Sequence, residues 1–242
     1  MDIYDKLKEH LQKLTTDRQQ LITINAKALS QEEAIGRPKE NDYPLAKGRE
    51  RIMEATWLKA KGQAFTDRFG HWQGTIQDIL DLPMKDNFDR ALLVASLNAA
   101  MCHEDEVMDT VHCRDEGPKK CSLELPAFFK AHKLQPPIVL IGYQPRLAEQ
   151  LATLGELRIV DLDVVNQGQN KAGTTILPPE RTEEALEGAG CAFVTGSTIV
   201  NGTITQFMNL DIPVIFFGVT IAGPAKVLGL TRFCASAIEG KK

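Results

Sequence analysis

The chain has 242 residues, of which 43% are hydrophobic and 25% charged, and its formal net charge is −4. This composition is typical of a globular protein with one large domain or two modest ones, and we favour two. Lysine and arginine are interspersed with acidic residues, so we expect no nucleic-acid partner. No apolar run approaches the roughly 20 residues of a membrane-spanning helix, and residues 1–10 are charged where a signal peptide is apolar. We therefore expect a cytoplasmic protein without a membrane partner.

The first part of the chain mixes helical and strand-like patterns. Apolar residues recur at steps of three and four over residues 3–14, which predicts an amphipathic helix. Residues 21–29 alternate with one apolar face and predict a strand, whereas residues 30–49 contain glycines and prolines and predict a loop. Strand-like patterns then return over residues 51–60 and 64–66.

The clearest helical pattern covers residues 88–102, where apolar residues occur at steps of four and three. A short helix is predicted before it, starting after the N-cap Thr75 and reaching Leu80. Residues 103–120 are charged and contain Gly-Pro, so we interpret them as a surface connection. Another helix is predicted over residues 122–132.

Short apolar runs alternate with helix-compatible segments after Pro136 and Pro137, which we interpret as a domain boundary. Such alternation predicts parallel strands covered by helices, here over residues 138–141, 157–162, 192–195 and 214–217. The predicted fold class is α/β: an α+β domain over residues 1–135, followed by a domain with a mostly parallel sheet over residues 136–242.

Ligands of an open parallel sheet bind outside the carboxyl ends of its strands. Gly142 and Gly218 each follow a predicted strand, and Asp161 lies at the end of one. Gly142 would let a ligand approach the backbone, although the G-x-G-x-x-G pattern of dinucleotide sites is missing. Asp161 fits a ribose-binding carboxylate and a solvated strand end equally well.

A turn rich in hydroxyl groups and glycine follows the run at residues 192–195. Small hydroxyl residues at such a turn offer donors to an anion, and we favour ligand contact over simple helix capping. The candidate residues of this turn and of the next strand end are Thr195, Gly196, Ser197, Thr198, Asn201 and Thr220.

Cysteine and histidine gather between residues 102 and 121. His112, Cys113 and Cys121 carry the ligand types of zinc and other soft transition metals. The C-x-x-C spacing is absent and Cys102 belongs to an apolar helical stripe, so we favour structural cysteines over a metal site. Motifs of serine hydrolases, P-loop proteins and zincins are also absent.

Several segments together resemble the heavy-metal chelation family, formerly a domain of unknown function. The resemblance spans most of the chain and is carried by YPLAKG at residues 43–48, GQAFTD at 62–67, residues 95–99, TGSTIVNGT at 195–203 and FGVTIAGP at 217–224. It implies an N-terminal domain similar to the N-terminal domain of enolase, a Rossmann-like C-terminal domain, and a site in the cleft between them.

The resemblance also implies which residues face that cleft. Lys47, Thr66, Asp67 and Asn98 would line it from the N-terminal side, with Thr195, Gly196, Ser197 and Asn201 opposite. For two of them a structural role is the alternative, because Asn98 can satisfy buried backbone groups and Asp67 can cap a turn.

Three hypotheses follow for the function. The leading one is a protein that binds a metal ion, or a small anionic metal-chelating ligand, in an interdomain cleft and handles metal or a metallo-cofactor. The second, motivated by Gly142 and Asp161, is an enzyme that uses a nucleotide or S-adenosylmethionine. The third is a non-catalytic regulatory protein. The sequence leaves the oligomeric state open, a homo-oligomer included.

Overall fold

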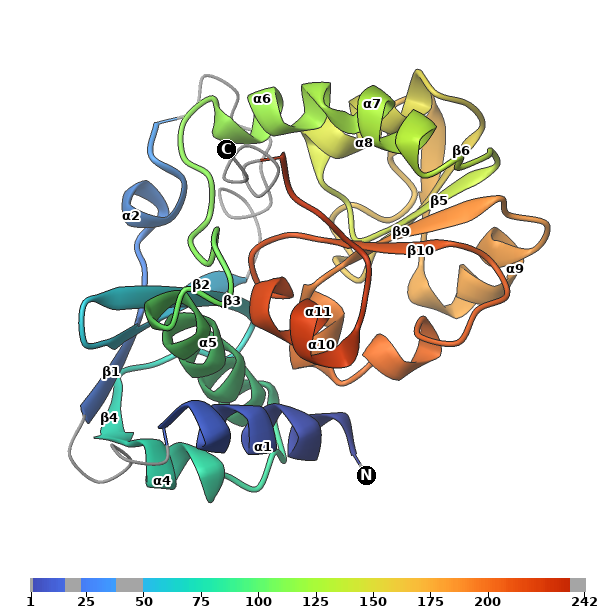
Figure 1. Ribbon diagram of the computed structural model, residues 1–242. Helices are drawn as coiled ribbons and strands as arrows, with labels where there is room; N and C mark the ends of the chain where they lie inside the picture. Colours follow the sequence, from blue (N-terminus) through green and yellow to red (C-terminus); the bar gives the residue numbers. More distant parts are fainter. Residues whose placement is uncertain (1, 16–22, 38–49, 236–242) are drawn as a thin grey trace.

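A computed structural model describes residues 2–15, 23–37 and 50–235, and this part of the chain is built around two β-sheets (Figure 1). The first is antiparallel, with strand order β3-β2-β1-β4: β1 (Thr23–Ala28), β2 (Arg51–Trp57), β3 (Ala60–Thr66) and β4 (Trp72–Thr75). The second is mostly parallel, with order β11-β10-β9-β5-β6-β8-β7: β5 (Ile138–Ile141), β6 (Leu157–Val160), β7 (Asn170–Lys171), β8 (Thr174–Leu177), β9 (Cys191–Thr195), β10 (Val214–Phe217) and β11 (Arg232–Phe233). The α/β class expected from the sequence is confirmed.

Helices cover both sheets, and none in the described part is long and apolar enough to cross a membrane. The N-terminal helices are α1 (Ile3–Thr15), α2 (Gln31–Ile35), α4 (Ile76–Leu80), α5 (Asn87–His103), α6 (Gly117–Leu123) and α7 (Leu125–Ala131). The later ones are α8 (Pro145–Ala152), α9 (Thr182–Leu186), α10 (Ser197–Asn201) and α11 (Ala222–Leu228), with 3-10 turns η1 (Pro179–Arg181) and η2 (Ile204–Gln206).

Helix α5 is the centre of the molecule. It packs against the antiparallel sheet on one side and against α10 and α11 on the other (Figure 1). Residues 91–101 are therefore all buried, although the sequence predicted a single apolar stripe. Gly62 of β3 permits close contact with this helix, because a Cβ there would lie 2.2 Å from the Ala95 carbonyl oxygen.

The parallel strands are buried on both faces. Ile138 and Leu140 contribute to the core beneath α7 and α8, whereas Val139 and Ile141 contribute to the core shared with α5. Figure 1 shows α6, α7 and α8 on one face of the sheet and α9, α10 and α11 on the other. Burial on both faces explains why these strands are continuous apolar runs in the sequence.

The order of the parallel strands reverses between β5 and β9. From β5 the chain proceeds outward through β6 and β8, then returns to β9 and proceeds the other way through β10 and β11. The carboxyl ends of β5 and β9 are tightly packed, since a Cβ on Gly142 (φ 88°) would lie 2.6 Å from Cγ2 of Thr195. Such a reversal point is where open α/β sheets bind ligands.

Two predicted elements are corrected by the structure. The helix expected over residues 122–132 is divided into α6 and α7 at Glu124, because Pro126 lacks an N–H and disfavours helical backbone before it. The expected loop at residues 30–49 contains α2, whose capping box joins Ser30 and Glu33. Residues 38–49 lie outside the described part of the chain.

The expected surface connection at residues 103–120 is also corrected, because its middle packs along the edge of β3. The backbone N–H of Gln63 donates to the Thr110 carbonyl at 3.0 Å, and the His112 N–H donates to Oε1 of Gln63 at 2.7 Å. Thr110 is 2% exposed. These hydrogen bonds hold the middle of the segment against the edge of β3.

Candidate functional site at the carboxyl edge of the parallel sheet

The end of β3 is fastened to the carboxyl edge of the parallel sheet. The N–H of Phe65 donates to Oγ1 of Thr220 at 3.0 Å. Asn98 of α5 donates through Nδ2 to the Gln63 carbonyl at 2.9 Å and accepts from the Gly223 N–H at 2.7 Å. Asn98 and Thr220 are 0% and 1% exposed, and their hydrogen bonds join the two halves of the protein.

A second polar contact crosses the same interface near the start of α5. Nδ2 of Asn87 donates to Oδ1 of Asp67 at 2.6 Å and lies 3.5 Å from Oδ1 of Asn201. Nε of Arg90 donates to the Val200 carbonyl at 2.6 Å. The structure thus brings Asp67 and Asn201 together, as expected, through Asn87 and Arg90, which the sequence did not indicate.

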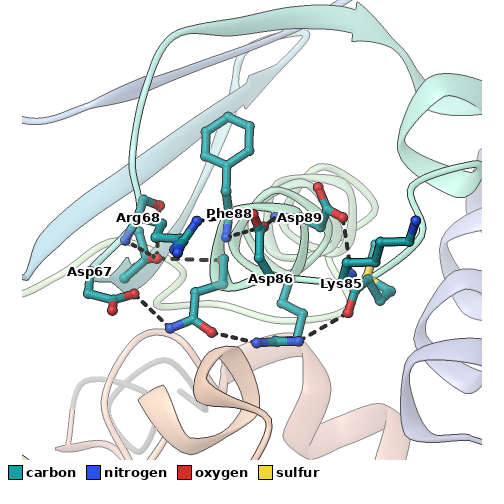
Figure 2. Close-up of polar contacts among 10 residues, drawn as sticks. Asp67, Arg68, Lys85, Asp86, Phe88 and Asp89 are labelled. Atoms are coloured by element: carbon teal, nitrogen blue, oxygen red, sulfur yellow. Dashed lines mark hydrogen bonds and ion pairs between the residues drawn. The ribbon is translucent and has the colours of Figure 1, made fainter.

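Figure 2 shows how the start of α5 is held at this place. The carboxylate of Asp86 accepts from the N–H groups of Phe88 and Asp89 at 3.0 and 3.1 Å, which caps the helix. Arg68 lies beside this cap, 3.6 Å from Asp86. The capped helix end gives Asn87 and Arg90 a fixed position against the second sheet.

Four carboxylates from both sheets lie near enough to one another at this edge for their charges to interact, and we call Glu50, Asp67, Asp161 and Asp163 the carboxylate cluster. Glu50 and Asp67 flank the last β2–β3 pair, Arg51 with Thr66. Burial, together with the charges of Asp161, Asp67 and Asp163, raises the pKa of Glu50 to about 7. Sequence reasoning missed Glu50, because only strand pairing and packing of the two sheets place it beside Asp161.

Asp161 also holds the ends of β5 and β6 together. Its Oδ2 accepts from the Tyr143 N–H at 2.5 Å, and its Oδ1 accepts from the Asp163 N–H at 2.8 Å and from Asn166 at 3.1 Å. Burial raises the pKa of Asp161, and these hydrogen bonds oppose the shift. They occupy most of the acceptor positions of a carboxylate, so a ribose contact has less support.

The hydroxyl-rich turn after β9 is engaged in local hydrogen bonds. The Ser197 N–H donates to Oγ1 of Thr195 at 3.4 Å, and Oγ1 of Thr198 donates to the Thr195 carbonyl at 2.8 Å. The Gly196 N–H donates to the Phe217 carbonyl at 2.8 Å. Ser197 and Thr198 are buried, and no side-chain cap hydrogen bond is formed at the start of α10, so ligand contact at this turn remains a prediction.

The remaining residues implied by the family resemblance differ in their surroundings. Thr66 is 1% exposed, and its hydroxyl donates to the Arg68 carbonyl at 2.9 Å and accepts the Arg68 N–H at 3.0 Å. Lys47 lies outside the described residues.

A cavity of about 100 Å³ lies at the same edge beside β10 and β11, and we call it the β11 cavity. His112, Cys113, Cys121 and Gly218 line it. The described part of the chain holds no group of three His, Cys, Asp or Glu side chains arranged to bind a metal ion, so a metal site at His112, Cys113 and Cys121 remains a prediction. His112 packs its ring against Phe65, with ring centroids 5.5 Å apart.

Two titratable groups of the β11 cavity, His112 and Cys121, are kept uncharged by burial. Burial lowers the pKa of His112 to about 4 and raises the pKa of the Cys121 thiol to about 11. At neutral pH the imidazole is neutral and the thiol is protonated, and a protonated thiol is a poor metal ligand.

The fold and this edge define an α/β protein in which an antiparallel sheet is fastened to the carboxyl edge of a mostly parallel one. Residues 129–224 match the sequence model of the DUF364 family, described as "Putative heavy-metal chelation". The family inferred from the sequence motifs is confirmed.

Two solved structures from the same family are similar to the chain. One, a protein of unknown function from Pyrococcus horikoshii, has a TM-score of 0.59 and 14% identity, with 90% of this chain and 80% of that chain covered. The other, of unknown function from Desulfitobacterium hafniense DCB-2, has a TM-score of 0.49 and 14% identity, with 74% and 72% covered. At this identity the likeness to the first shows the fold alone. Comparison with curated proteins finds no match.

Proposed function

We propose that this protein binds a transition metal ion at the carboxylate cluster, and that the ion brings part of its own ligand shell as water or a small chelator. The proposal rests on Glu50 and Asp67, which flank the last β2–β3 pair and lie near enough to Asp161 and Asp163 for the charges to interact. Like charges in a partly buried site disfavour one another's ionised form, and a bound cation relieves this repulsion. The description of the family, heavy-metal chelation, agrees with a cationic cargo.

The described residues provide only part of the ligands that a metal ion needs. They contain no ready set of three metal-binding side chains, so a cage made wholly of protein ligands has no support there. Mg²⁺ is commonly held by one or two carboxylates and several waters, and carboxylate and water ligands also suit Mn²⁺. The negative charge of the carboxylate cluster also disfavours binding of an anionic chelator without its metal. Of the two ligands expected from the sequence, the metal ion is therefore the better supported.

The finer description of the fold belongs to the same proposal. We infer that residues 1–135 form a domain similar to the N-terminal domain of enolase and that residues 136–242 form a Rossmann-like domain. The reversal of strand order between β5 and β9 supports the second assignment. The metal would then bind where the two domains meet.

Binding of cobalt tests the proposal, because Co²⁺ is coloured and its absorption reports the ligand set. We expect one Co²⁺ per chain at micromolar concentration in equilibrium dialysis. Glu50→Gln and Asp163→Asn should each weaken binding at least about tenfold, which corresponds to about 1.4 kcal/mol. The exposed Asp211→Asn serves as the control and should bind like the wild type.

Two results would count against the carboxylate cluster. One is no bound cobalt at millimolar concentration, with or without a tridentate chelator. The other is binding that survives both carboxylate substitutions but is lost in a Cys113→Ser, Cys121→Ser double variant.

The second candidate is a nucleotide- or S-adenosylmethionine-utilising enzyme, which the strand-order reversal favours because such sheets bind nucleotides at that point. It predicts that an adenosine-containing ligand raises the melting temperature, and that Asp161→Ala abolishes the rise. A regulatory protein, the third candidate, would bind neither metal nor nucleotide and would retain a protein partner on pull-down.

A further inference from the structure

We propose that the β11 cavity is a separate binding site for a small α-amino acid. The residues that line it come from the segment before α6, from α6 itself, from the start of α8, and from the ends of β10 and β11. None of the four residues of the carboxylate cluster lines it. The proposal therefore stands or falls independently of metal binding.

Three buried polar atoms at this cavity point to a ligand. Oδ2 of Asp109, Nδ1 of His112 and Nε of Arg232 are buried and have no hydrogen-bond partner among the described residues. All three residues line the cavity. Buried polar atoms without partners cost folding free energy, and native proteins rarely gather several at one place without a use for them.

The opposite charges of Arg232 and Asp109 favour a ligand that carries both a negative and a positive charge. Arg232 provides a cation and Asp109 an anion, and the two are held side by side because Nη2 of Arg232 donates to the Asp109 carbonyl at 3.1 Å. An α-amino acid carries a carboxylate and an ammonium on neighbouring atoms. Its carboxylate would accept from Nε of Arg232, and its ammonium would donate to Oδ2 of Asp109 and Nδ1 of His112.

The rest of the cavity suits a small apolar side chain. Leu147, Phe217, Val219 and Phe233 form apolar walls. Gly218 has a φ of 93° and open space where a Cβ would stand, so the backbone leaves room for the ligand there. The volume of about 100 Å³ restricts the ligand to the smaller amino acids.

Isothermal titration calorimetry with L-valine, L-alanine and L-leucine tests the proposal. We expect at least one of them to bind with a stoichiometry of one. Two analogues of valine test the contribution of each charged group. 3-Methylbutanoate lacks the ammonium, and 2-methylpropylamine lacks the carboxylate. Each should bind at least about tenfold more weakly than L-valine, because each loses one charge-assisted contact.

Two matched pairs of variants locate the binding. Asp109→Asn keeps the shape and tolerates a left-handed backbone, and it should weaken binding at least about tenfold. Its control is Asp105→Asn, an exposed aspartate in the same connection with a φ of 54°. Gly218→Ala should likewise weaken binding, whereas Gly229→Ala, with a φ of 68° and equally open surroundings, should not.

Three results would overturn the proposal. The first is no heat of binding for any of these amino acids at millimolar concentration while all variants remain folded by circular dichroism. The second is equal affinity for L-valine and 3-methylbutanoate, which would show a simple anion site. The third is an affinity for the amino acid that stays at the wild-type value in Asp109→Asn and Gly218→Ala as well as in their two controls.

Discussion

Removal of the Asn98 side chain should destabilise the protein more than most single substitutions. In Asn98→Ala, the N–H of Gly223 and the carbonyl of Gln63 lose the amide that now pairs them at 2.7 and 2.9 Å. Each buried group left unpaired costs roughly 1–3 kcal/mol. We therefore expect a loss of roughly 3–5 kcal/mol, a large share of the ~5–15 kcal/mol that stabilises a typical protein.

Urea denaturation followed by circular dichroism measures this loss. Asn209→Ala is the matched control, because Asn209 is exposed and its substitution should change stability by less than about 0.5 kcal/mol. Asn98→Asp adds a second test: it keeps the size and one acceptor but buries a carboxylate against the Gln63 carbonyl, and should also destabilise strongly. A loss below about 1 kcal/mol in Asn98→Ala would refute the role of this amide as the main polar link between the halves.

Three further predictions follow from the same edge of the sheet. Gly142→Ala should cost roughly 2–4 kcal/mol in urea denaturation, because its φ is 88° and the new Cβ would lie 2.6 Å from Thr195; Gly168→Ala, with a φ of 75° and open surroundings, should cost only about 1 kcal/mol. The raised pKa of Glu50 means that the folded state keeps a proton that the unfolded chain releases, so this contribution to stability is lost as pH rises from about 4.5 to about 7. Glu50→Gln should remove that loss, and equal pH dependence of wild type and variant would contradict it. Because burial raises the pKa of Cys121 to about 11, iodoacetamide at pH 8 should label it at least about tenfold more slowly than in the unfolded chain, as measured by mass spectrometry of its peptide.

The pattern of apolar residues along the sequence was sufficient to predict the helices and strands that are buried along most of their length. The helix expected over residues 88–102 is α5, and the apolar runs at residues 138–141 and 214–217 are β5 and β10. Thr75 caps α4 as predicted, because capping depends only on the next three residues. The turn at Leu58, which divides residues 51–60 between β2 and β3, was missed since it lacks the usual glycine or asparagine at its positive φ of 55°.

The sequence by itself determined the α/β class, the family and the strand ends at which ligands of such sheets bind. Only the tertiary structure decided what the polar residues at those ends do. Asn98 and Thr220 became buried links because the end of β3 meets the edge of the parallel sheet. Glu50 joined Asp161 for the same reason. The hydrogen-bond partners and charge interactions of a polar side chain depend on which groups become its neighbours. Packing of the two sheets, and not the local sequence pattern, decides which residues more than 100 positions apart come into contact.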